Sequence, residues 1–265
     1  MIPETSIIYM GISAFLTIAL PIGLYLFWRK KYHLRIMPML IGASLFFVSV
    51  MILEALLHSV VLAPDENGAI ALLQYPALYV IYAVLAAGIF EESARFLAFK
   101  VLKGRYSGLG TGLAYGIGHG GIEAVLLVGV NMLVYIGISN IANSGNMEVL
   151  NSVPDMDQML AVLSGTPDYM FLVGGFERVL AISAHIALSV IMWLSVNKDG
   201  KKWLYPAAIV LHAVLNIPAA LMQCGVIENV FLVEALTLVG AGLIVAFAVL
   251  MVKKTNEEAS LNSVY

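Results

Sequence analysis

The chain has few charged residues and almost no cysteine. Charged residues make up only 12% of its 265 residues, whereas 61% are hydrophobic. A typical soluble domain has about 25% charged residues, so a soluble globular protein is excluded. Cys224 is the single cysteine, which rules out an internal disulfide and argues against a cysteine-based metal site. The formal net charge of −3 offers no basic surface, so we expect no nucleic-acid partner.

Long apolar runs recur along the whole chain, whose mean hydropathy is +0.92. A transmembrane helix needs about 20 consecutive apolar residues. The sequence therefore predicts an all-α, polytopic membrane protein with a single integral-membrane domain over residues 1–265. We expect about seven spans, at approximately 6–28, 36–62, 73–99, 107–139, 169–196, 203–222 and 229–252. The longest connection, 140–168, is expected to contain a short helix after Pro154.

Lysine and arginine alternate with acidic residues from one connection to the next. The first, third and fifth connections and the segment after the last span are basic, and the even connections contain acidic residues but no lysine or arginine. Basic residues favour the cytoplasmic side. We therefore expect the N-terminus outside and the C-terminus in the cytoplasm.

A set of ionisable side chains nevertheless lies deep inside four of the predicted spans. A charged group at the bilayer centre costs about 2.5–3.5 kcal/mol on insertion scales, so these groups are expected to pair with one another or with water in a shared interior site. They are Glu91, Glu92 and Arg95; His119 and Glu123; Glu177, Arg178 and His185; and His212, accompanied by Asn216.

Most of these residues are expected at a common depth. With a helical rise of ~1.5 Å per residue, Glu91, His119, His185 and His212 lie roughly 13–18 Å from the cytoplasmic ends of their spans. Glu177 and Arg178 come out at roughly 28 Å, near the outer interface, where a structural or loop-facing role is expected. Glu54 and His58, near the outer end of the second span, are also expected to be structural.

Spacing within the helices supports one shared site. Residues three or four apart share a helical face, which pairs Arg95 with both glutamates, His119 with Glu123, and His212 with Asn216. Glu91 and Glu92 differ by about 100° around the axis and cannot make the same contacts. One interpretation is that Arg95 neutralises one carboxylate while the other faces the cavity as a general base.

Glycines punctuate the fourth predicted span. Gly108, Gly112, Gly116 and Gly120 repeat at every fourth position, a pattern that lets a neighbouring helix approach closely. The segment 116–121 also matches G-x-G-x-x-G, but it lacks the strand and βαβ unit of a dinucleotide site. We interpret the stripe as a packing surface.

Three short motifs resemble those of a known superfamily. Glu91-Glu-Ser-Ala-Arg95 resembles the EExxxR motif of the CAAX-protease and bacteriocin-processing superfamily of intramembrane proteases, Tyr115-Gly-Ile-Gly-His119 resembles its FxxxH motif, and His212-Ala-Val-Leu-Asn216 resembles its HxxxN motif. With His185 on the span before HxxxN, residues 85–260 look most like the YhfC branch of intramembrane metalloproteases. The related PrsW branch has a glutamate at the position of Glu123, so either His119 or Glu123 is the second-motif residue.

The resemblance implies catalytic roles for individual residues. Glu91 and His119 would activate a water, and His212 and Asn216 would bind the oxyanion. Arg95 would hold the pair of glutamates in place, and Glu92 would orient or buffer it. His185 would bind metal or transfer protons. His119, His185, His212 and Glu91 are the candidate zinc ligands, although metal-free general-base chemistry would use the same side chains.

The expected function is hydrolysis of a peptide bond in a membrane-embedded peptide or protein, in the bacterial cytoplasmic membrane that the YhfC resemblance implies. A non-catalytic scaffold or binding protein is the main alternative. A proton-coupled transporter is a weaker one, because the motif-bearing helices have no counterparts in the other half of the chain, as an inverted repeat would require.

Overall fold

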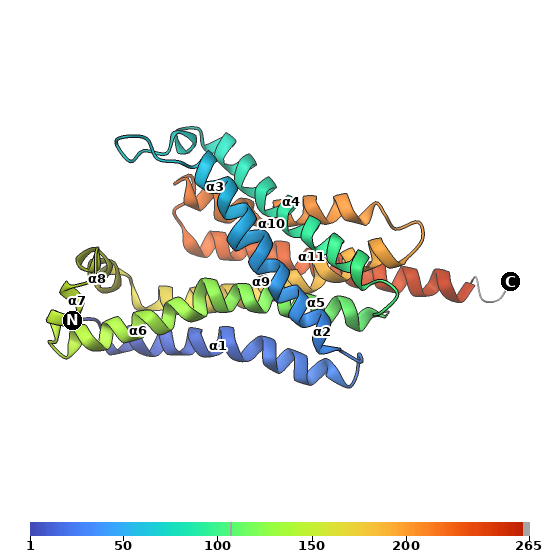
Figure 1. Cartoon of the computed structure of the whole chain (residues 1–265), viewed down its shortest axis with the longest axis horizontal. Coiled ribbons are helices and arrows are strands. Elements are labelled where there is room, and N and C mark those ends of the chain that lie inside the picture. Colours follow the sequence, from blue (N-terminus) through green and yellow to red (C-terminus); the bar gives the residue numbers. More distant parts are fainter. Residues whose placement is uncertain (107, 262–265) are drawn as a thin grey trace.

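The protein is described here by a computed structural model that covers residues 1–106 and 108–261 (Figure 1). All regular secondary structure in those residues is helical, as the sequence predicts. The elements are α1 (Glu4–Arg29), α2 (Ile36–Phe46), η1 (Phe47–Glu54), α3 (Ala55–Val61), η2 (Ala71–Gln74), α4 (Pro76–Leu102), α5 (Leu109–Ala124), η3 (Val125–Gly129), α6 (Val130–Asn143), α7 (Met147–Asn151), α8 (Met156–Gly165), α9 (Asp168–Asn197), α10 (Leu204–Gln223) and α11 (Val230–Leu261).

Seven helical segments are long and apolar enough to cross a membrane, which confirms the predicted number of spans. They are Glu4–Arg29, Ile36–Val61, Pro76–Leu102, Leu109–Asn143, Asp168–Asn197, Leu204–Gln223 and Val230–Glu258. The third begins later than predicted because a separate 3₁₀ turn, η2, precedes Pro76, which occupies the first position of α4. The helix expected in the longest connection is α8, which begins just after Pro154.

Two of the spans contain a π-helical segment. The second changes from α2 to η1 and back to α3, and the fourth changes from α5 to η3 and then to α6. A π-helical turn holds extra residues, so it rotates the side chains that follow it, and such turns are frequent at functional sites. Here η1 ends at Glu54, and η3 begins two residues after Glu123.

Helix α9 forms the centre of the bundle. It packs against α1, α4, α5, α10 and α11, and residues 184–196 are all buried. Apart from His185, Ser189 and Ser195, its side chains over this stretch are apolar on every face, as expected of a helix surrounded by protein. The other spans present large apolar residues outward, such as Phe15, Val101 and Leu243, at 73%, 81% and 65% exposure, which is consistent with a lipid environment.

The predicted packing role of the glycines is confirmed for three members of the stripe. Gly112, Gly116 and Gly120 face α9, and a Cβ atom on Gly116 would lie 2.5 Å from the Cα of Ile186. Gly118, outside the stripe, lies against α2 with the carbonyl oxygen of Met39 only 1.9 Å from an added Cβ. Helix α5 is therefore held tightly between α2 and α9. Gly108 differs, because a Cβ atom added there would have no neighbour within 4 Å. It precedes the helix and has a φ angle of +97°.

Candidate active site

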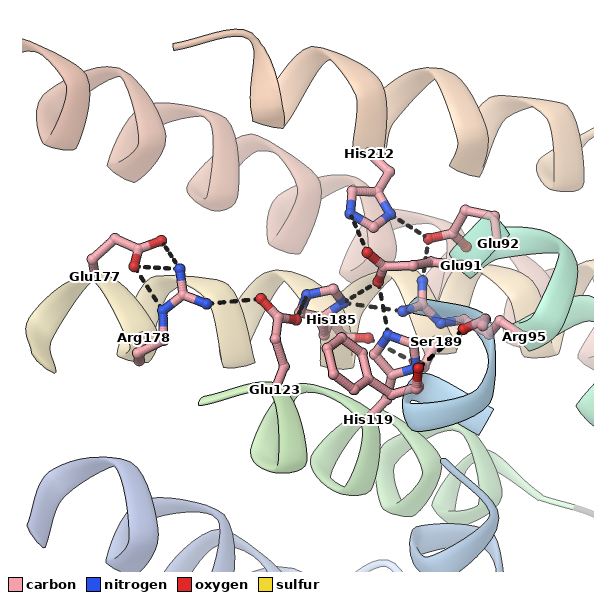
Figure 2. Close-up of polar contacts among 12 residues, drawn as sticks. Glu91, Glu92, Arg95, His119, Glu123, Glu177, Arg178, His185, Ser189 and His212 are labelled. Atoms are coloured by element: carbon pink, nitrogen blue, oxygen red, sulfur yellow. Dashed lines mark hydrogen bonds and ion pairs between the residues drawn. The ribbon is translucent and has the colours of Figure 1, made fainter. Parts of the chain in front are cut away.

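The polar residues of the four predicted spans meet in one buried cluster. Figure 2 shows side chains from α4, α5, α9 and α10 pointing toward one another. Each has a relative exposure of 6% or less, apart from Glu123, which is also largely enclosed with a side chain 12% exposed. The cluster consists of Glu91, Glu92, Arg95, His119, Glu123, His185 and His212.

Glu91 lies at the centre of this cluster, facing three imidazole rings. Its Oε2 atom is 2.8 Å from Nε2 of His119, which is a hydrogen bond. The same oxygen is 3.8 Å from Nδ1 of His185, and Oε1 is 3.9 Å from Nε2 of His212. The last two distances are too long for hydrogen bonds. Glu91 is therefore directly paired with one histidine and open toward two others.

Glu92 turns to a different set of partners. Arg95 donates a hydrogen bond to its Oε1 atom, and Nδ1 of His212 lies 2.9 Å from that same oxygen. All three side chains are almost completely buried. The two adjacent glutamates thus have different partners, as the sequence suggested. Arg95 neutralises Glu92, while Glu91 faces the histidines. Because Glu92 holds Nδ1 of His212, the Nε2 atom of that ring is turned toward Glu91.

His185 is held from both sides. Nη2 of Arg95 lies 3.0 Å from Nδ1, and Oε2 of Glu123 lies 2.5 Å from Nε2. A guanidinium group can only donate hydrogen bonds, so Nδ1 must be the unprotonated nitrogen. The neutral ring therefore carries its proton on Nε2, beside the Glu123 carboxylate.

A second arginine extends the cluster toward the N-terminal end of α9. Nη1 of Arg178 is 2.8 Å from Oε1 of Glu123, and the same guanidinium is paired with Glu177. Of the two expected roles of Arg178, structural or loop-facing, its contacts favour the structural one, because its side chain is only 13% exposed and is paired with Glu123. The sequence did contain a signal: Arg178 precedes His185 by seven residues, which places both on one face of a helix.

Two further residues stand at the edge of the cluster. Asn216 lies one turn beyond His212 on α10, is half-buried, and makes no side-chain hydrogen bond to any residue that the structure describes. Glu54 is 5% exposed at the end of η1, forms an ion pair with His58 at 3.3 Å, and is close enough to Glu91 to interact electrostatically with it. Glu54 was expected to be structural, and periodicity could not reveal its proximity to Glu91 because it lies at the end of a π-helical segment.

The chemistry and spacing of the donors fit a divalent cation. Glu91, His119, Glu123 and His185 can each offer one ligand atom within 4.8 Å of the others, and carboxylates with imidazoles form a usual zinc ligand set. The four glutamates of the two ion-pair networks face only two guanidinium groups, which leaves two surplus negative charges when the histidines are neutral. Of the predicted ligands, only His212 lies outside this group of four, and Glu123 takes part in it.

The two central histidines differ in how ready they are to bind such a cation. His212 has its Nδ1 hydrogen-bonded to Glu92 and its Nε2 directed at Glu91, an arrangement typical of a histidine ligand with a carboxylate partner. In His185, Arg95 occupies Nδ1 and the proton occupies Nε2. His185 would have to lose that proton to coordinate, so His212 is the better prepared ligand although it lies outside the compact group of four.

Residues 16–237 match the family described as YhfC intramembrane metalloprotease. The chain belongs to this family. It is also 36% identical over 253 residues to a Bacillus subtilis (strain 168) protein described as "Uncharacterized membrane protein YhfC", an alignment that covers 94% of this chain and 97% of that relative. No solved structure matches. The family match spans every residue of the buried cluster and confirms the YhfC resemblance seen in the motifs.

Proposed function

We propose that this protein is an intramembrane endopeptidase that hydrolyses a peptide bond of a membrane-embedded peptide or protein. The observation that carries the proposal is the Glu91–His119 hydrogen bond of 2.8 Å, buried among membrane-spanning helices and facing two further histidines. A carboxylate paired with an imidazole can move protons, and the cost of placing both in a membrane argues for a functional reason.

In this mechanism Glu91 is the general base. Its carboxylate accepts a proton from the attacking water and later gives it to the leaving amine, while Nε2 of His119 holds the carboxylate in place. Bound near Glu91 and His212, with Glu123 adjacent, a divalent cation such as zinc would acidify a water and polarise the scissile carbonyl. Without a cation, a protonated His212 together with Asn216 would supply hydrogen bonds to the oxyanion.

The motifs also support a finer placement. We propose that the chain is a member of the CAAX-protease and bacteriocin-processing superfamily, as EExxxR and HxxxN in this order suggest. We further propose that the basic connections lie in the cytoplasm of a bacterial cell, with the N-terminus outside. The depth of the cluster would then place the scissile bond near the middle of the membrane.

Elemental analysis of the detergent-purified full chain tests the metal. We expect close to one zinc per chain in the wild type, and loss of that zinc in both E91A and H212A. H58A is the matched control, because His58 is an intramembrane histidine that contacts Tyr82 and Glu54 and is bonded to none of the seven residues of the cluster. Thermal unfolding of each variant would establish that the fold is retained.

Cleavage is tested separately in vesicles containing membrane proteins from cells that lack this chain. New peptide N-termini, identified by mass spectrometry, are expected with the wild type and with H58A. E91Q should reduce their rate of appearance by about 10²–10⁴-fold, the usual contribution of a general base. Zinc without cleavage would support the scaffold alternative, and cleavage that persists in E91Q would refute the mechanism.

A further inference from the structure

An apolar cavity of about 560 Å³ lies away from the buried cluster, among α1, α5, α9 and α11. Helices α1 and α11 both pack against α9, which forms the floor between them with Ile186, Ala187 and Val190. None of the residues of the Glu/His cluster lines this cavity. The proposed chemistry therefore does not account for it.

The cavity extends over about one leaflet of a bilayer. On α11 its lining runs from Val245 to Lys253, which corresponds to about 12 Å of helix. Half of the hydrocarbon core of a membrane is about 15 Å thick. Trp28 and Tyr32, at the C-terminal end of α1, and Lys253, on the C-terminal part of α11, all line the cavity, and the C-terminal ends of these two helices lie on the same side of the bundle (Figure 1). Aromatic residues of this kind concentrate at the membrane interface.

Positive charge surrounds that interfacial end. Lys253 lines the cavity itself, and Nζ of Lys31 lies 5.2 Å from the centre of the Tyr32 ring. The turn after Trp28 forms a second hollow, lined by Arg29, Lys30 and Arg35. Among the described residues that line these two hollows, none is acidic. The charge pattern thus matches a negatively charged headgroup at the end of an apolar slot.

We propose that this cavity binds an anionic phospholipid, with an acyl chain between α1 and α11 and the phosphate at Lys253. Basic pockets between transmembrane helices are a known form of headgroup site. The distribution of polarity favours a lipid over a peptide helix, because the lining is apolar along α9 and α11, apart from Ser183, and becomes basic only at Lys253. An acyl chain with a phosphate at one end has the same distribution.

The test is native mass spectrometry of the purified full chain, titrated with phosphatidylglycerol and with phosphatidylcholine of the same acyl chains. We expect one phosphatidylglycerol to bind at least fivefold more tightly than phosphatidylcholine. K253Q should weaken phosphatidylglycerol binding about fivefold, the contribution of one basic residue near a lipid surface. K254Q, which alters the neighbouring lysine outside the cavity lining, should leave binding unchanged.

Filling the slot tests the acyl chain. Val249 lines the cavity and is 48% exposed, so V249W should be accommodated by the fold and should abolish binding of both lipids. V239W is the matched control on the same helix, because Val239 is 60% exposed and lies outside the lining. If V249W does not fold, V245W replaces it, since Val245 also lines the cavity and is 37% exposed.

Four results would overturn the proposal. Equal affinity for the two lipids would show that the cavity has no site for an anionic headgroup. Equal effects of K253Q and K254Q would show that the binding is only a general attraction between the lipid and the basic surface. Retained lipid binding in V249W would show that the slot is not the site. If V249W instead blocks binding of a fluorescent transmembrane peptide, the cavity is a peptide site and the lipid assignment is wrong.

Discussion

Two arginine networks flank His185, and they have similar composition but different surroundings. In the first, Arg95 is paired with Glu92 and bonded to His185, with both charged side chains at 0% exposure. In the second, Arg178 is paired with Glu123 and Glu177, and their side chains are 13%, 12% and 25% exposed. Each network thus contains one guanidinium group, but only the first is completely enclosed.

The difference suggests distinct roles for the two networks. Arg95 sets the hydrogen bonding of two rings at once, directly for His185 and through Glu92 for His212. Arg178 reaches the cluster only through Glu123. The inner network therefore positions the groups to which we assign the proposed chemistry, whereas the outer network anchors a single carboxylate beside them.

The largest expected effect is the loss of Arg95. R95M leaves Glu92 as a buried carboxylate without its cation, and removing one partner of a buried ion pair costs about 3–5 kcal/mol. R178M should cost less, about 1–3 kcal/mol, because water reaches its partners. Thermal and denaturant unfolding of the two purified variants in the same detergent measures both losses. Equal destabilisation would show that the two networks do not differ in this way.

The next effect concerns metal affinity. E92Q weakens the acceptor that orients His212, and loss of such a partner typically lowers metal affinity about 10–100-fold. E177Q, which changes the matching carboxylate of the outer network, should stay within about twofold of the wild type. Zinc competition against a chelator gives both values. A drop in E177Q as large as that in E92Q would mean that the outer network also controls the metal site.

The smallest expected effect concerns which ring nitrogen of His185 carries the proton. In metal-free protein we expect His185 to carry its proton on Nε2 and none on Nδ1, because Arg95 donates to Nδ1. Nitrogen-15 NMR of histidine-labelled protein distinguishes the two tautomers, with H185Q assigning the signal. A proton on Nδ1 would contradict the contact with Arg95 and would make His185 as ready a metal ligand as His212.

Most of the architecture was predictable because the membrane constrains it so strongly. Apolar runs of spanning length leave few alternatives to helices, and a regular helical rise is enough to place Glu91, His119, His185 and His212 at one depth. The glycines at 112, 116 and 120 likewise indicated a close contact. These inferences need only local periodicity, which a sequence displays directly.

The partners within the site were harder to predict. Arg178 was assigned to the outer interface by its distance along α9, yet a long side chain carries its charge to Glu123. Glu54 was placed correctly in the second span, but the π-helical segment that ends at this residue changes the side-chain register. Both contacts escaped the sequence analysis because residue counting follows the backbone, while contacts depend on side-chain length and on local departures from 3.6 residues per turn.

The sequence by itself determined that this chain spans a membrane with seven helices and carries most of its intramembrane ionisable residues in four of them. Only the tertiary structure decided that Arg95 takes Glu92 rather than Glu91, and that His212 turns its Nε2 toward Glu91. The physical reason is that hydrophobic length and periodicity are properties of one helix. The choice between two adjacent carboxylates depends instead on how α4, α9 and α10 are rotated against one another.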